Sequence, residues 1–212
     1  MPPSLLSRRQ LIPIVIAGLL AMAVLVMPAI RDVSFSVIGT QWFASVGSGI
    51  PKVDLASEVG LLLLAATTAA GIVHAWVRHP ERRTTLVAGA GGVVAAYAVS
   101  EGMKLLFAQP RPCSRWQIVS ECPPAGDWSL PSNHATLAFG AAVVIAVAVG
   151  RNRITAAALA IALVVTLGRV MQGVHYVHDV ALGAVIGMVS TSAVVVLVSA
   201  WQDRNAEARI RR

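Results

Sequence analysis

The chain has 212 residues, of which 56% are hydrophobic and only 13% are charged, and its mean hydropathy is +0.71. A soluble domain has about 25% charged residues, so this composition excludes an ordinary soluble domain and favours a membrane protein. The net charge of +7 does not indicate a nucleic-acid partner, because membrane topology and anionic lipid headgroups account for it.

Six apolar segments follow one another along the chain, and most approach the ~20 residues that a helix needs to cross the hydrocarbon core. Backbone polar groups find no water there, so we expect each segment to be an α-helix. The expected fold class is all-α, a polytopic membrane protein with six transmembrane helices in one bundle and a single domain over residues 1–212. The segments are Leu11–Ile30, Ser57–Val77, Thr84–Phe107, His134–Gly150, Ile154–Gly173 and Val180–Trp201.

The first segment follows Arg8 and Arg9, as the core of a cleavable signal peptide would. Its apolar run of about 20 residues is longer than the roughly 7–15 residues of a signal-peptide core. The small-residue sequence Ala21–Met22–Ala23 lies inside this run and not after it. We therefore favour a retained helix, with a signal peptide as the alternative.

The basic residues predict the orientation. Six helices place both termini on one side, and most of the 17 Lys and Arg residues belong to that side. The positive-inside rule then puts both termini on the cytoplasmic side of a bacterial inner membrane. The basic residues on the cytoplasmic side are Arg8, Arg9, Arg78, Arg82, Arg83, Arg151, Arg153, Arg204, Arg209, Arg211 and Arg212.

Two loops on the opposite, outer side are longer than the inner ones. We expect a surface-lying turn or helix around Trp42–Phe43 in the first of these loops. The second contains the two cysteines of the chain, Cys113 and Cys122. A disulfide can form outside the cytoplasm and would contribute roughly 2–3 kcal/mol in so short a loop. We favour this disulfide over two independent thiols, and a metal site lacks suitable partner ligands nearby.

Three clusters of ionisable residues interrupt the apolar chain where segments end, and charges at a membrane margin indicate a functional site. In the first cluster, Lys104 lies near the end of a segment and Arg111 just beyond it. Pro110 and Pro112 stop the helix, so both cations can converge on one point of the outer surface. The alternative is that these basic side chains reach for lipid headgroups.

The second cluster is Pro131–Ser132–Asn133–His134. Ser132 is expected to cap the following helix, whose outward-pointing amides make an anion site. His134 lies in the first turn, where it could donate a proton to a leaving oxygen. A surface histidine at the membrane interface is the alternative.

The third cluster contains Arg169, His175 and Asp179. A spacing of four residues places His175 beside Asp179 if both lie on one helical turn. A carboxylate that binds one ring nitrogen fixes the tautomer and leaves the other nitrogen as a nucleophile. An interfacial ion pair is the alternative, and His178 is expected to point away from the pair.

Together the clusters resemble the signature of the type-2 phosphatidic acid phosphatase superfamily, the lipid phosphate phosphatases, which reads Lys-x6-Arg-Pro, Pro-Ser-Gly-His and Ser-Arg-x5-His-x3-Asp. The first motif is complete at Lys104, Arg111 and Pro112. Asn133 stands where the second motif has Gly, and Gly168 stands where the third has Ser. The resemblance extends over the segments from Ser57 to Trp201.

The resemblance implies a phosphatase that needs neither a metal nor another cofactor. His175 would attack phosphorus to give a phosphohistidine, Asp179 would orient its ring, and His134 would protonate the departing oxygen. The expected ligands of the phosphate oxygens are Lys104, Arg111, Ser132, the Asn133 amide and Arg169.

The expected substrate is a phosphate or diphosphate on a membrane lipid: a polyprenyl diphosphate, a prenyl-linked sugar phosphate, phosphatidylglycerophosphate or phosphatidic acid. Glu101, Trp116, Asp127 and Trp128 are candidates for headgroup selection, with a local ion pair and interfacial anchoring as their alternative roles. Two other functions stay open. A vanadate-dependent haloperoxidase uses the same constellation but is soluble, and a lipid transporter would not need both histidines.

Overall fold

The computed structural model describes residues 34–116, 122–150 and 152–210, and the regular secondary structure in these ranges is helical. The expected first segment, Leu11–Ile30, lies outside the described residues, as do Arg8 and Arg9. The elements are α2 (Phe35–Gly47), α3 (Val53–Arg78), the 3₁₀-helix η1 (Pro80–Arg82), α4 (Arg83–Phe107), α5 (Pro112–Arg115), α6 (Asn133–Val149), α7 (Arg153–Met171) and α8 (Val177–Ile210).

Four helices in the described ranges are long and apolar enough to cross a membrane: α3, α4, α7 and α8. The 17-residue α6 is shorter, as its segment was in the sequence. Large apolar side chains point outwards; Leu62, Leu106 and Leu197 are 69%, 82% and 69% exposed. Water disfavours such a surface and lipid accommodates it, so the all-α membrane fold expected from the sequence is confirmed.

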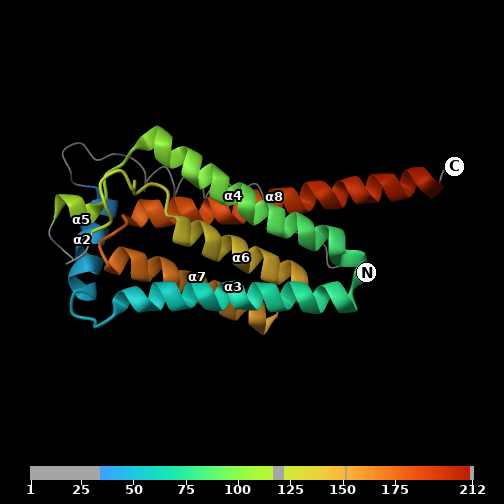
Figure 1. Cartoon of the computed structure of the whole chain (residues 1–212), viewed down its shortest axis with the longest axis horizontal. Coiled ribbons are helices and arrows are strands. Elements are labelled where there is room, and N and C mark those ends of the chain that lie inside the picture. The colour runs from blue at the N-terminus through green and yellow to red at the C-terminus, as the bar shows by residue number, and fades with distance from the viewer. Residues whose placement is uncertain (1–33, 117–121, 151, 211–212) are drawn as a thin grey trace.

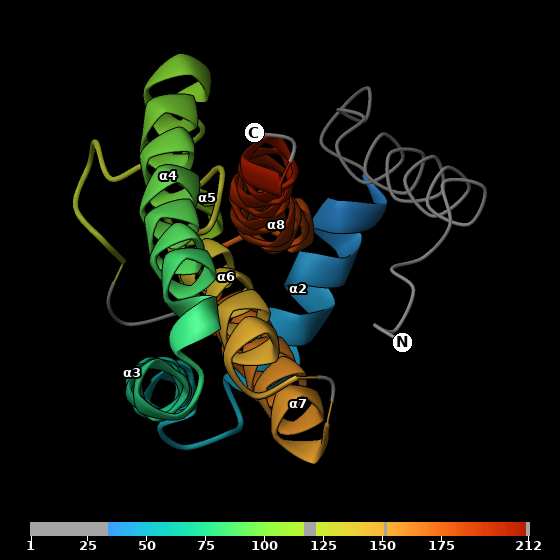
Figure 2. The same cartoon turned by 90° about the vertical axis from the view of Figure 1, so that its right-hand side faces the viewer.

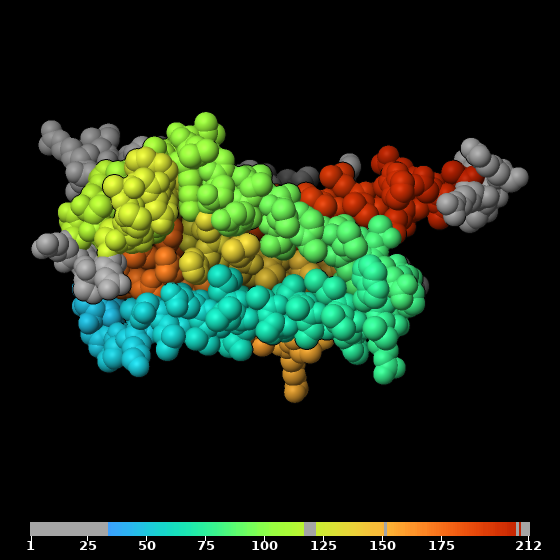
Figure 3. Space-filling model, viewed as in Figure 1, coloured from blue at the N-terminus to red at the C-terminus, as the bar shows by residue number. Residues whose placement is uncertain are grey.

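The short α6 is the centre of the bundle. It contacts α3, α4, α7 and α8, and the view along the bundle shows it between these helices (Figure 2). In the space-filling view α6 is visible only in the seam between α3 and α4 (Figure 3). Its small residues, among them Ala135, Ala138 and Ala142, are buried and let its neighbours approach closely.

Gly183 brings α8 against the start of α6. A Cβ atom at this position would lie only 2.4 Å from the carbonyl oxygen of Ser132, so only glycine permits this approach. The Ser132 amide in turn donates to the carbonyl oxygen of Asp179 over 3.1 Å. The packing of two helices therefore aligns the second polar cluster with the third.

All three polar clusters lie at one end of the bundle, the end that carries α2 and α5 (Figure 1). The expected surface helix around Trp42–Phe43 is confirmed as α2, and Trp42 is 60% exposed. The opposite face of α2 buries Ser36 and Thr40. The C-terminal end of α8 extends beyond the other end of the bundle (Figure 1).

Candidate active site

His175 and Asp179 meet at the junction of α7 and α8. His175 Nδ1 lies 3.5 Å from Asp179 Oδ2, and both side chains are almost completely buried. The expectation that both lie on one helical turn is wrong. His175 precedes α8, in the bend after α7, whereas Asp179 is in the first turn of α8. The bend, rather than the helix, therefore brings His175 to the carboxylate.

The Asp179 carboxylate is held from several directions. Oδ2 accepts hydrogen bonds from the Tyr176 amide (2.7 Å) and from the Ser129 hydroxyl. Oδ1 accepts from Gln109 Nε2 over 2.9 Å. The bond from Tyr176 caps the start of α8, since a carboxylate in the first turn reaches back to the amide before the helix. Asp179 therefore fixes both the helix start and the neighbouring histidine.

His178 also belongs to this network, so its expected role as a bystander is wrong. Its Nε2 atom lies 3.1 Å from Asp179 Oδ1, and its Nδ1 atom lies 2.7 Å from the Ser36 hydroxyl of α2. Thr40 of α2 accepts a hydrogen bond from the Val177 amide over 3.0 Å. The helix α2 thus buttresses the start of α8, which the motif spacing does not reveal.

Arg111 connects this histidine centre to the loop that contains Asp127. Its NH1 group lies 3.2 Å from His175 Nε2 and donates to the Val174 carbonyl over 3.0 Å. Its Nε and NH2 groups donate to the Asp127 carbonyl oxygen (2.9 Å) and carboxylate (2.8 Å). Burial opposes ionisation of Asp127, but the hydrogen bond and charge of Arg111 prevail and lower the pKa of its carboxyl group.

Lys104 lies in the last turn of α4, at the end of the bundle that contains the other polar clusters, and it is buried. Its ammonium group forms an ion pair with Glu101 at 3.1 Å. Glu101 also accepts a hydrogen bond of 2.5 Å from the Asn133 side chain, and Ser100 donates to the other end of that amide over 2.8 Å. The Asn133 side chain therefore bonds to α4.

Ser132 is the residue before α6, as expected, but its side chain makes no capping bond. Its hydroxyl is buried and, within the described part of the chain, has no hydrogen-bond partner. His134 follows in the first turn, near enough for the charges of Arg169, His175, Arg111 and Lys104 to act on its ring. A buried, unpaired hydroxyl beside this helix start suits an anionic ligand.

Arg169 is oriented by Gln172, whose side-chain oxygen accepts from NH1 over 2.8 Å. Gln172 in turn donates to the Ser57 hydroxyl of α3 over 3.3 Å. A Cβ atom at Gly168 would lie 2.3 Å from that hydroxyl oxygen. Ser57 therefore places a hydroxyl where the family signature has a serine side chain, and Gly168 leaves the room for it.

His175 is neutral near pH 7. Burial lowers its pKa to about 4 and outweighs Asp179, which favours the charged ring. With a proton on Nδ1 facing Asp179, Nε2 carries the ring's lone pair, which faces the NH1 donor of Arg111 at 3.2 Å. Such a ring is chemically suited to nucleophilic attack.

Cys113 and Cys122 form the expected disulfide, with their Cα atoms 5.7 Å apart. It ties α5 to the loop that carries Asp127. Trp116 packs edge-on against Tyr176, with ring centroids 6.0 Å apart. In the described ranges no group of three or more His, Cys, Asp or Glu side chains is arranged to hold a metal ion.

The comparisons with known proteins agree with the motifs. The model of the PAP2 superfamily matches residues 85–203. The chain belongs to the PAP2 superfamily. It is 34% identical over 148 residues to decaprenylphosphoryl-5-phosphoribose phosphatase of Mycobacterium tuberculosis, in strains CDC 1551 and H37Rv. That match covers 69% of this chain and 75% of the relative.

A solved structure shows the same fold. The crystal structure of LpxE from Aquifex aeolicus superposes with a TM-score of 0.58 at 20% sequence identity. The superposition covers 79% of this chain and 99% of LpxE. All three motifs lie inside the matched PAP2 region, whereas Ser36, Thr40 and Ser57 lie before it.

Proposed function

We propose that this member of the PAP2 superfamily hydrolyses a lipid-linked phosphate at the outer face of a bacterial inner membrane, through a phosphohistidine on His175. The contacts of the His175 ring are the observation that carries the proposal. One ring nitrogen lies 3.5 Å from Asp179, and the other lies 3.2 Å from the Arg111 guanidinium, a natural phosphate ligand. The His175 ring thus contacts its orienting carboxylate through one nitrogen and a cation through the other.

The reaction proceeds in two displacements. The His175 Nε2 lone pair forms a bond to phosphorus while the bond to the lipid oxygen breaks, and His134 gives that oxygen a proton. Asp179 stabilises the positive charge that develops on the ring. Water then attacks the phosphohistidine and loses a proton to His134. The nitrogen–phosphorus bond breaks, and inorganic phosphate leaves.

The proposed phosphate ligands replace a metal ion. Lys104, Arg111 and Arg169 bind a phosphate with a charge of about −2, and they stabilise the charge that develops in the transition state. The Ser132 hydroxyl, which has no partner among the described residues, and the amides at the start of α6 supply further donors. We therefore expect turnover without a divalent cation or another cofactor.

The substrate class follows from the setting and from the relatives. A site at one end of a membrane bundle is accessible to headgroups of the surrounding lipids. The name of the mycobacterial relative specifies a phosphoribose attached to a decaprenyl phosphate. Among the candidates, a prenyl-linked sugar phosphate of the cell envelope therefore has the strongest support, ahead of polyprenyl diphosphate, phosphatidylglycerophosphate and phosphatidic acid.

Two other functions have less support. A haloperoxidase-like activity would require bound vanadate, and the long apolar helices favour a membrane lipid over a soluble halide substrate. A vanadium-dependent bromination assay distinguishes it. A transporter would move lipid without releasing phosphate, so turnover by purified protein separates that case.

The test is phosphate release by purified protein from a panel of these four lipid classes, with and without EDTA. We expect release from at least one lipid, undiminished by EDTA, inhibited by vanadate and abolished in His175→Ala. No release from any lipid would contradict the proposal. Loss with EDTA and recovery with Mg²⁺ would contradict the metal-independent mechanism.

A further inference from the structure

Two carboxylates accompany the cations of the first motif. Glu101 lies 3.1 Å from the Lys104 ammonium, and Asp127 lies 2.8 Å from the Arg111 guanidinium. The two cation side chains are only 10% and 6% exposed, whereas the two carboxylates are 45% and 43% exposed. Each pair therefore presents its negative member to the incoming headgroup and keeps its positive member inside.

These groups form one electrostatic network. Glu101 and Asp127 are near enough for their charges to interact, and Lys104 acts on both of them. Asn133, where the family signature has Gly, bonds to Glu101 over 2.5 Å and holds it in place. The two carboxylates offset two of the three motif cations, so the site favours one phosphate and has little positive charge left for a second.

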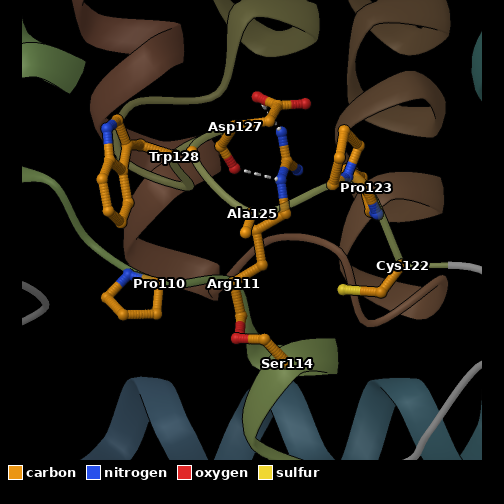
Figure 4. Close-up of a pocket in the computed structure, with 10 residues that line it drawn as sticks. Pro110, Arg111, Ser114, Cys122, Pro123, Ala125, Asp127 and Trp128 are labelled. Carbon is orange, nitrogen blue, oxygen red and sulfur yellow. Dashed lines mark hydrogen bonds and ion pairs between the residues drawn. The ribbon is translucent and has the colours of Figure 1, made fainter.

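A cavity of about 280 Å³ lies beside Arg111 in the disulfide loop (Figure 4). Asp127 and the Trp128 ring line it together with Pro110 and Pro124. The wall of this cavity is mostly apolar and suits the apolar face of a ring in the headgroup, and the Asp127 carboxylate, bound to Arg111, can accept hydrogen bonds from hydroxyl groups at the edge of that ring. A carboxylate has about four acceptor positions, and Arg111 occupies one of them on Asp127.

We propose that Glu101 and Asp127 make this site selective for a phosphomonoester on a hydroxylated, sugar-like headgroup and disfavour a lipid diphosphate. This inference rests on the proposed phosphatase function. In a diphosphate the second phosphate is bonded directly to the one that is cleaved and would lie close to the two exposed carboxylates, whereas in a sugar-linked substrate the ring keeps the prenyl phosphate farther from them. A like charge at about 6 Å in a partly screened setting changes binding by about tenfold.

The experiment compares kcat/KM for three lipids that share one prenyl chain: a sugar phosphomonoester, a hydroxyl-free phosphomonoester and a diphosphate. We expect the wild type to prefer the sugar monoester over both. Glu101→Gln and Asp127→Asn keep the shape of the side chain and remove its charge. Each should reduce the preference for monoester over diphosphate about tenfold, and Asp127→Asn should also reduce the preference for the sugar over the hydroxyl-free lipid.

Asp54→Asn is the matched control. It removes an exposed carboxylate in the first turn of α3, at the same end of the bundle, and should leave all three ratios unchanged. If the wild type is active but both test variants keep the wild-type ratios within about twofold, the selectivity proposal is wrong and the phosphatase proposal stands. No activity on any of the three lipids would overturn the phosphatase function itself. Each variant is compared with the wild type separately, so either one suffices if the other is not recovered folded.

Discussion

Gln109 donates a hydrogen bond of 2.9 Å to Asp179 and thereby joins the first motif to the third. The same side chain lies 3.0 Å from the His178 ring, and the backbone carbonyl oxygen of Gln109 accepts a hydrogen bond from the Ser129 amide over 2.8 Å. Gln109 lies just beyond the end of α4, in the turn that the two prolines stiffen. Lys-x6-Arg-Pro therefore supplies more than cations, because one of its variable positions orients the carboxylate behind the nucleophile.

We predict that Gln109→Leu lowers kcat by about 10–100-fold and changes KM little. A hydrogen bond to a buried carboxylate is worth roughly 1.5–3 kcal/mol, and here it acts on the orientation of His175 and not on the lipid. Steady-state kinetics of the purified variant measure kcat and KM separately. Gln202→Leu, near the other end of α8, is the control and should behave as wild type. A change in KM alone would show that Gln109 contacts the lipid.

The acid limb of the pH profile should reflect His175. Because burial lowers the pKa of this ring to about 4, the nucleophile stays neutral well below pH 6.5 and is lost only when protonated near pH 4. We expect kcat/KM of the free enzyme to fall on the acid side with an apparent pKa near 4. Samples returned to pH 7 control for irreversible unfolding. An acid limb with an apparent pKa of about 6.5, the ordinary value for histidine, would contradict the effect of burial on His175.

The penalty for His134→Ala should depend on the leaving group. A lipid alkoxide is a poor leaving group and needs the proton, so monoester hydrolysis should fall by ~10²–10⁴-fold. A diphosphate releases a lipid phosphate, which leaves more readily, so the proportional loss should be smaller. The ratio of mutant to wild-type rates on the two lipids is the measurement. Equal, complete losses would assign His134 to phosphate positioning instead of proton transfer.

The sequence predicted the apolar helices of the described ranges and the motif residues, because apolar length and motif spacing are local properties of the chain. It did not predict the Asp179 partners Gln109 and Ser129 or the His178 partner Ser36, since these residues come from distant segments and have no periodic signal. It also placed His175 on a helix, because a spacing of four does not distinguish a helical turn from a bend. The contact from Asn133 to Glu101 likewise depends on how α4 packs beside α6.

The effect of placing a serine at position 168 should be reversed by a second substitution, at Ser57. Gly168→Ser would force the Ser57 hydroxyl out of its position 2.3 Å from the new Cβ atom, which disrupts the contact to Gln172 and thus to Arg169. We expect a loss of about 1–3 kcal/mol in stability and weaker phosphate binding. Ser57→Ala in the same chain should restore both, as measured by thermal unfolding in detergent and by KM. Additive losses in the double variant would show that the two positions are independent.

The proposed mechanism requires His175 to carry the phosphoryl group, and this intermediate can be trapped. Protein mixed with a lipid labelled at its phosphate is quenched in alkali within one turnover, since a nitrogen–phosphorus bond survives base and is labile in acid. We expect the label on the peptide that contains His175, sensitive to acid and absent in His175→Ala. Label on another residue, or normal turnover by His175→Ala, would contradict the covalent mechanism.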